Sequence, residues 1–158
     1  MSEGDGAVRN GEFKTWRERL GLTISTMAAL LGVSETTVKA WDKGRHRIPV
    51  GAAEEVELLR AYTRRCVDTV AGAARDAVVD AAARAGTPMV LVWHLTEEMP
   101  PGPARALGAT WWRAVAAAAQ ERVSGIAIGY AAELDGVAGS RDRTLSEAIG
   151  PSVLPPPR

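Results

Sequence analysis

Apolar residues recur at helical spacing in the first third of the chain. Phe13, Trp16 and Leu20 follow one another at intervals of three and four, which predicts a helix that begins near residue 12. Gly21 and Gly32 are placed to end this helix and the next one, because glycine readily adopts the left-handed conformation found at many helix ends. The pattern predicts short helices separated by tight turns.

The second and third helices each follow a hydroxyl side chain that can cap free backbone N–H groups. Thr23 precedes a helix expected over about 24–31, and Ser34 precedes the third helix. Val38 and Trp41 of the third helix are expected to point inward. Its outward side chains are then Glu35, Thr36, Lys39 and Ala40. Two helices joined by a short glycine-containing turn, the second of them polar on its outer side, are typical of a helix-turn-helix.

The remainder of the chain carries a longer helical pattern and two short apolar runs. Spacings of three and four persist over 50–86, where Gly72 leaves open whether there is one helix or two. The run 89–95 is typical of a strand buried on both faces, and its backbone groups need a hydrogen-bonding mate. That mate is either 126–130, which follows a helix over about 110–123, or the same strand in a second subunit.

These elements predict a mainly α fold in two parts. A helix-turn-helix bundle over residues 12–65 is followed by a small α+β dimerisation domain, in the order helix, strand, helix, over residues 66–135. Residues 1–11 lack periodicity and are expected to form a flexible tail. Residues 136–158, which end in a run of prolines before the last arginine, are expected to be disordered.

The formal net charge of the chain is zero, but the charges are unevenly distributed. Residues 13–50 contain seven Lys and Arg against three acids, a net of +4. Residues 1–12 carry one base against three acids and residues 51–158 eleven against thirteen, so each of these segments has a net of −2. A basic module beside acidic segments is the electrostatic pattern expected of a phosphate-binding face.

Residues 16–44 resemble the helix-turn-helix of the phage-repressor family of regulators, the Cro/CI or XRE type. The similar stretches are Trp16–Thr23, Met27–Ser34 and Thr37–Gly44. Five residues fall at the family's spacing, namely the small Ala28, the turn glycine Gly32, Val38, Trp41 and Gly44. This match covers roughly 40 of the 158 residues.

This resemblance implies a sequence-specific transcriptional regulator of phage or prophage type that binds double-stranded DNA. Such a protein would act as a repressor, including of its own promoter if it is autoregulatory. It would bind a palindromic operator as a homodimer in the cytoplasm, associated with the nucleoid when on DNA.

The third helix and the basic loop after it are the expected DNA contacts. Base edges are assigned to Thr36, Thr37, Lys39 and Ala40. Glu35 either accepts a hydrogen bond from cytosine or only stabilises the helix N-terminus. Phosphates and the adjacent minor groove are assigned to Ser34, Lys43, Arg45, His46 and Arg47. Ile24 departs from the family pattern, which often has a DNA-contacting glutamine at this position.

The second half resembles, over short matches, the anti-CRISPR-associated branch of the same family, in which a small dimerisation domain with a strand follows the helix-turn-helix. The matches are Trp41–Arg45, Ile48-Pro49, Glu54–Leu59 and Trp93–Thr96. The dimer interface is accordingly assigned to Val90, Leu91, Val92, Trp93, Trp111 and Trp112. The two adjacent tryptophans have two further interpretations, as core residues or as a stacking platform for single-stranded bases.

No catalytic, metal or cofactor site is expected, so the chain is not expected to be an enzyme. His46 and His94 lie far apart in sequence, and no group of His, Cys, Asp and Glu has metal-ligand spacing. The chain also lacks a nucleophile elbow, a phosphate loop and a dinucleotide-binding fingerprint.

Neither a membrane partner nor secretion is expected. No apolar run approaches the roughly 18 to 20 residues that span a bilayer, and the polar, acidic N-terminus is unlike a signal peptide. The only cysteine, Cys66, is interpreted as a small buried apolar residue, and a chain without disulfides fits a reducing cytoplasm.

A protein-interaction module is the alternative from a different class of function. The helix-turn-helix would then be a scaffold, and the chain would bind a protein, as an antitoxin binds a toxin or a phage protein binds a host partner. Ile24 and an exposed Leu30 favour this alternative, because together they could form an apolar surface patch.

Overall fold

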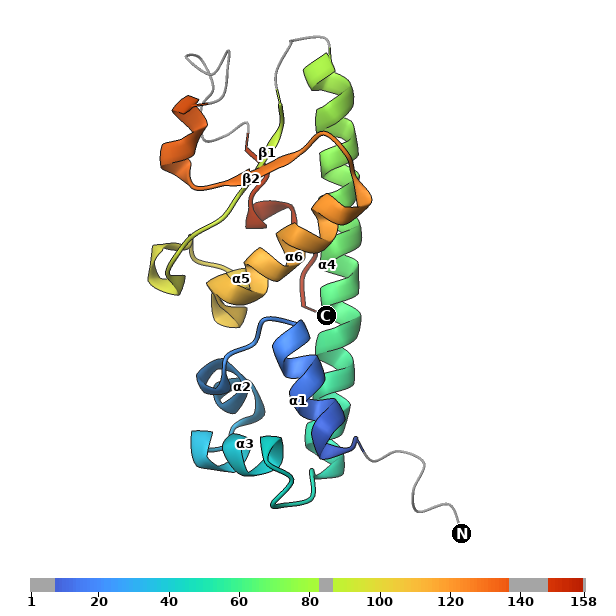
Figure 1. Ribbon diagram of the computed structural model, residues 1–158, viewed down its shortest axis with the longest axis vertical. Helices are drawn as coiled ribbons and strands as arrows, with labels where there is room; N and C mark the ends of the chain where they lie inside the picture. The colour runs from blue at the N-terminus through green and yellow to red at the C-terminus, as the bar shows by residue number, and fades with distance from the viewer. Residues whose placement is uncertain (1–7, 83–86, 137–147, 158) are drawn as a thin grey trace. The chain divides into compact units, whose positions relative to one another are not determined.

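Helices form most of residues 8–82, 87–136 and 148–157, the part of the chain that the computed structural model describes (Figure 1). The mainly α prediction is confirmed, with one small parallel sheet. The helices and strands are, in order, α1 (Asn10–Arg19), α2 (Ile24–Leu31), α3 (Glu35–Asp42), α4 (Val50–Ala82), β1 (Met89–Leu91), η1 (Thr96–Glu98), α5 (Pro103–Leu107), α6 (Ala109–Arg122), β2 (Ala127–Gly129), η2 (Ala131–Gly136) and η5 (Pro151–Val153). The chain divides into two compact units, unit 1 (Met1–Thr63) and unit 2 (Arg64–Arg158).

The second and third helices of unit 1 begin at the predicted caps. The Thr23 hydroxyl accepts a hydrogen bond from the backbone N–H of Thr26 at 3.1 Å. The Ser34 hydroxyl accepts one from the N–H of Thr37, also at 3.1 Å. Gly32 ends α2 in the left-handed conformation, with φ 66°. The bounds of α2 agree with the predicted range because caps and glycine are strictly local signals.

The first helix starts earlier than predicted, at Asn10. The flexible-tail prediction for 1–11 is therefore wrong for its last two residues, while residues 1–7 lie outside the described part of the chain. The reason is a tertiary contact, since the Asn10 amide donates to the carbonyl oxygens of Trp41 at 2.9 Å and His46 at 2.7 Å.

An aromatic pair lies at the centre of unit 1. The rings of Phe13 and Trp41 meet edge to face, with centroids 5.6 Å apart and an interplanar angle of 84°. Val38 is buried with them, so α1 and α3 share one core. The first part of α4 contacts α1 through the guanidinium of Arg60, which lies 3.7 Å from the centroid of the Trp16 ring.

The long helical pattern forms one helix, α4, which is 33 residues long and passes through Gly72 without a break. Glycine costs about 1 kcal/mol relative to alanine inside a helix, and burial of Val70, Ala71 and Ala74 beside it offsets that cost. The alternative of two helices is therefore wrong over 50–82, and residues 83–86 lie outside the described part of the chain. Neither α4 nor any other described helix is both long and apolar enough to cross a membrane.

Only the first three residues of the strand predicted over 89–95 form a strand, β1, which belongs to a two-stranded parallel sheet in unit 2. β1 pairs with β2, and Val90 lies opposite Ile128. On its other side Val90 pairs with Ile149, through hydrogen bonds from Leu91 N–H to the Ile149 carbonyl at 2.8 Å and from Ile149 N–H to the Met89 carbonyl at 2.9 Å. The predicted mate 126–130 is therefore confirmed, whereas pairing with a second subunit is wrong because both sides of β1 are already occupied.

The residues assigned to a dimer interface belong to the core of unit 2. The side chains of Trp111 and Trp112 are fully buried, and the Trp112 indole N–H donates to the Leu91 carbonyl at 2.7 Å. Five of the six are buried and Trp93 is partly buried: Val90, Leu91, Val92, Trp111 and Trp112. The interface assignment is corrected, because these side chains are already packed within one chain. Their burial also rules out a stacking platform for bases and favours the core interpretation.

The C-terminal segment is ordered where the structure describes it. Residues 148–157 include the Ile149 bridge and η5, and the Arg65 guanidinium donates to the Pro157 carbonyl at 3.3 Å. The disorder prediction is therefore wrong for this stretch, and residues 137–147 lie outside the described part. The proline-rich composition did not predict this order, because proline lacks a backbone N–H donor but does not prevent an extended backbone from packing.

Candidate nucleic-acid interface

Helix α3 is oriented by its apolar side. Val38 and Trp41 are buried, and a helix that turns 100° per residue then directs Thr36, Lys39 and Lys43 to the opposite side, where all three are exposed. The Ser34 cap fixes the start of the helix. The helix therefore cannot rotate about its axis without removing Val38 and Trp41 from the core. The polar side of α3 is therefore a preformed surface.

All ten residues predicted to contact DNA lie on this helix or on the segment that follows it. Eight are exposed, namely Ser34, Glu35, Thr36, Lys39, Lys43, Arg45, His46 and Arg47. Thr37 and Ala40 are partly buried. The Thr37 hydroxyl is 2.9 Å from that of Ser34, so both hydroxyls are already engaged in the cap.

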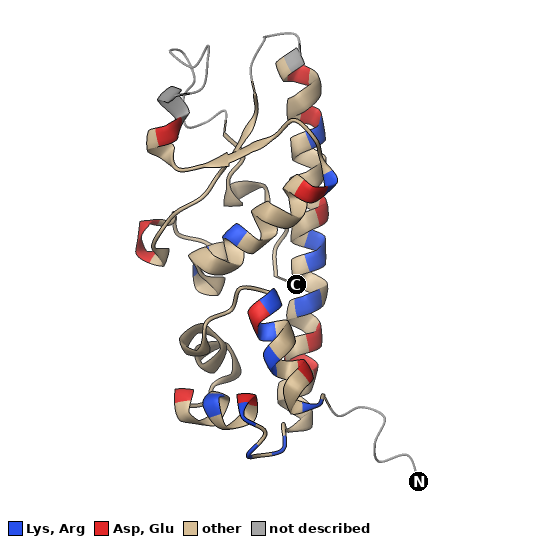
Figure 2. Cartoon of the chain, viewed as in Figure 1, with Lys and Arg blue, Asp and Glu red and all other residues tan. Residues whose placement is uncertain are grey.

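The cations of this surface are unpaired. Among the described residues, no ion pair involves Lys39, Lys43, Arg45 or Arg47. By contrast, Lys14 on α1 lies 3.8 Å from Glu18. Figure 2 shows the basic positions on α3 and on the segment after it. Four unpaired cations within nine residues give unit 1 a localised positive surface.

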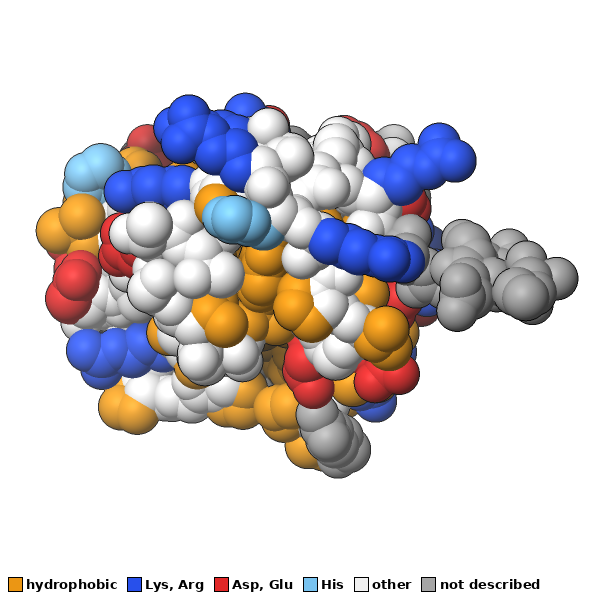
Figure 3. All heavy atoms as spheres, turned by 90° about the horizontal axis from the view of Figure 1, so that it is seen from below, with side chains coloured by type: hydrophobic (Ala, Val, Ile, Leu, Met, Phe, Trp, Pro, Cys, Tyr) orange, Lys and Arg blue, Asp and Glu red, His pale blue; other side chains and the backbone are white. Residues whose placement is uncertain are grey.

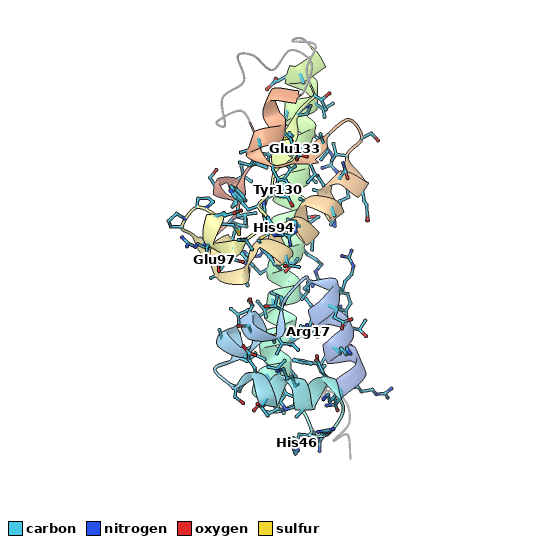
Figure 4. All side chains as sticks on the ribbon, turned by 60° about the vertical axis from the view of Figure 1, so that its left-hand side comes forward. Arg17, His46, His94, Glu97, Tyr130 and Glu133 are labelled. Carbon is cyan, nitrogen blue, oxygen red and sulfur yellow. The ribbon has the colours of Figure 1, made fainter. Side chains whose placement is uncertain are left out.

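The segment after α3 is held at both of its ends. Gly44 turns the backbone with φ 74°, and the N–H of Arg45 donates to the Ala40 carbonyl at 2.9 Å. The amide of Asn10 binds the carbonyl of His46, and Ile48 is buried, which anchors the far end. The side chains between these anchors are exposed, and Figure 4 shows His46 at the surface beyond the helices of unit 1. Figure 3 shows Lys and Arg side chains on both sides of a histidine on this face.

A buried ion pair that the sequence did not predict joins the ends of α1 and α3. Arg17 and Asp42 were counted among the charges of the basic module, yet their side chains are only 9% and 8% exposed. They neutralise each other, so the net of +4 is unchanged and is carried by the remaining residues. No sequence signal identifies the pair, because its members are 25 positions apart.

The apolar patch on which the protein-interaction alternative depended is not present as predicted. Leu30 and Ile24 are both partly buried rather than exposed. Among the described large hydrophobic side chains of unit 1, the exposed ones are instead Val50 and Leu58, both on α4. The specific observation that favoured this alternative is therefore lost.

No cluster of three or more His, Cys, Asp and Glu side chains suited to a metal ion occurs within the described ranges. Comparison of the chain with protein-family models, curated proteins and solved structures gives no match. The resemblance to phage repressors therefore stays a prediction, and the interpretation of the surface depends on its geometry and charge.

Proposed function

We propose that the chain is a transcriptional regulator that binds specific sequences of double-stranded DNA by placing α3 in the major groove. The observation that carries the proposal is the phase of α3. Val38 and Trp41 are buried, and the opposite side presents exposed, unpaired Lys39 and Lys43. Neither lysine forms an ion pair with another described residue, so both can bind an external anion.

The dimensions and charges of the surface suit duplex DNA. The major groove is about 12 Å wide and admits an α-helix, whereas the narrower minor groove does not. With α3 in the groove, the segment that carries Lys43, Arg45 and Arg47 would lie along the phosphates and fix the register of the helix. Those contacts would supply affinity, and the side chains of α3 would supply base recognition.

A homodimer on a palindromic operator is part of the proposal, on grounds of affinity. One helix in one groove contacts few base pairs, so regulators of this kind commonly bind two half-sites about one helical turn apart. The buried strand and tryptophans of unit 2 no longer support this point. We propose repression as the outcome, because a dimer bound across a promoter would exclude the polymerase.

The test is selection from a library of random duplexes, followed by affinity measurements on the enriched sequence. We expect a palindromic consensus that binds about a thousandfold more tightly than a duplex with the same bases shuffled. Sedimentation of the complex should give two chains per duplex. Equal affinity for enriched and shuffled duplexes would contradict sequence-specific binding, and one chain per duplex would contradict only the homodimer.

A further inference from the structure

Two opposite charges on α3 lie one helical turn apart and do not bind each other. Glu35 and Lys39 are four residues apart, the spacing at which side chains on a helix surface are neighbours. Both are exposed, and neither forms an ion pair among the described residues. The first helix offers a contrast at the same spacing, since Lys14 and Glu18 do pair there. Glu35 and Lys39 are therefore available to an external ligand.

The edges of a G·C base pair in the major groove are complementary to these two side chains. Guanine presents two acceptors, O6 and N7, which a lysine ammonium can satisfy, and cytosine presents an N4 amino donor, which a carboxylate can accept. An A·T pair has a single amino donor on the purine and a methyl group on thymine, and it offers no base with two acceptors. An acid and a lysine side by side therefore discriminate in favour of G·C.

Two smaller side chains of the outward side also carry methyl groups. Thr36 is exposed and Ala40 is partly exposed, and both carry a methyl group. Methyl groups pack against the C5 methyl of thymine. Because burial of Val38 and Trp41 fixes the phase of the helix, these positions face the same groove as Glu35 and Lys39.

We infer that α3 reads a half-site whose core holds one or two G·C pairs beside a thymine. Lys39 donates to guanine, Glu35 accepts from the cytosine amino group, and the methyls of Thr36 and Ala40 contact thymine. The inference rests on the proposed function, which it deepens by naming the base pairs that are read.

Glu35 also lies in the first turn of α3, where a negative charge interacts favourably with the helix dipole and stabilises the helix even when no DNA is bound. That structural role predicts a change in stability without any change in base preference. Base preference is therefore the readout that separates reading from stabilisation. Glu12 offers a matched control, because it is the exposed first-turn acid of α1 and lies off the α3 surface.

The experiment is selection from a random duplex library with the full-length chain and four variants. Glu35→Gln should lose its preference for cytosine by about tenfold and gain adenine, since glutamine pairs with adenine N6 and N7. Lys39→Gln should likewise lose guanine at its own position. The controls Glu12→Gln and Lys14→Gln make the same charge changes on α1 and should leave the consensus unchanged.

The possible results separate the two proposals. If the wild-type chain enriches a consensus without G·C pairs, the inference is wrong and the proposed function stands. The same holds if neither Glu35→Gln nor Lys39→Gln alters the consensus. If no duplex is enriched by any variant, both are wrong. Both side chains are exposed and form no ion pair with another described residue, so the variants should unfold at the same denaturant concentration as the wild type, apart from the small helix-dipole contribution.

Discussion

The guanidinium of Arg17 and the carboxylate of Asp42 form a two-point ion pair in unit 1. Nη2 lies 2.7 Å from Oδ2 and Nε lies 3.4 Å from Oδ1. The third nitrogen, Nη1, donates to the Leu22 carbonyl at 2.9 Å. This single side chain joins the end of α1, the turn before α2 and the end of α3. The orientation of α3, the proposed recognition helix, therefore depends on an ion pair that is itself buried and does not contact DNA.

Breaking this pair should destabilise unit 1 strongly. Asp42→Ala removes the buried partner of Arg17 and leaves only the exposed Glu18 carboxylate at 3.6 Å, which costs about 3 kcal/mol of unfolding free energy. Arg17→Lys keeps the charge but loses the two-point geometry, so a smaller loss is expected. Urea unfolding followed by circular dichroism measures both.

The matched double variant Arg17→Met/Asp42→Leu removes both charges and fills their space with apolar atoms. It should be more stable than Asp42→Ala, because no uncompensated charge remains. A double variant that is less stable than Asp42→Ala would show that the ion pair is not the source of the loss.

Asn10 is expected to position the basic segment after α3. Asn10→Ala removes hydrogen bonds to the Trp41 and His46 carbonyls and should lower the unfolding free energy by about 1–2 kcal/mol. Duplex binding should weaken while the base consensus stays the same, because α3 keeps its own core. Anisotropy titrations would test this, with Gly11→Ala as the neighbouring control, since nothing lies within 4 Å of a Cβ added there.

If Asn10→Ala loses stability as expected but binds duplex as tightly as the wild type, the basic segment after α3 keeps its conformation without the two hydrogen bonds of Asn10. Asn10→Asp provides a second variant of nearly the same size. Its carboxylate accepts but does not donate, so it should behave like the alanine variant.

Two glycines of the chain should respond to alanine in opposite directions. Gly72 is helical and has nothing within 4 Å of an added Cβ, so Gly72→Ala should raise the unfolding free energy by about 0.5–1 kcal/mol. Gly32 also has open space but has φ 66°, so Gly32→Ala should lower it by about 1 kcal/mol. Thermal or urea unfolding distinguishes the two, and a stabilised Gly32→Ala would contradict the left-handed turn.

The segment around Ile149, which pairs with β1 on the side opposite β2, should contribute to the stability of unit 2. Ile149→Pro removes the N–H that donates to Met89, leaves that buried carbonyl unsatisfied and should cost about 3 kcal/mol. Ile149→Val keeps the N–H and most of the side chain, and about 1 kcal/mol is expected. If the two variants were equally stable, the bridge between Val90 and Ile149 would not be formed in solution.

Local signals explain what could be predicted from the sequence. Thr23, Gly32 and Ser34 act on backbone groups within a few positions, so α2 and α3 were predicted correctly. The inward positions of Val38 and Trp41 followed from the same local phase. The candidate surface was placed on the exterior for that reason.

Long-range contacts explain what could not be predicted. The Arg17–Asp42 pair, the hydrogen bonds of the Asn10 amide and the bridge between Val90 and Ile149 join residues 25 to 59 positions apart. Side-chain type alone does not indicate which distant partner a polar group finds. The dimer assignment failed for the same reason, because the need of an apolar strand for a hydrogen-bonding mate does not indicate whether that mate is 126–130 or a second subunit.

The salt dependence of duplex binding tests the central claim most directly. The double variant Lys43→Ala/Arg45→Ala removes two exposed cations after α3, and the control Arg64→Ala/Arg75→Ala removes two exposed cations of α4 in unit 2. If the first two contact phosphates, the slope of log K against log salt should become shallower by about 2, with an unchanged base consensus, whereas the control should keep the wild-type slope. A wild-type affinity and slope in the first variant would contradict a DNA interface at α3.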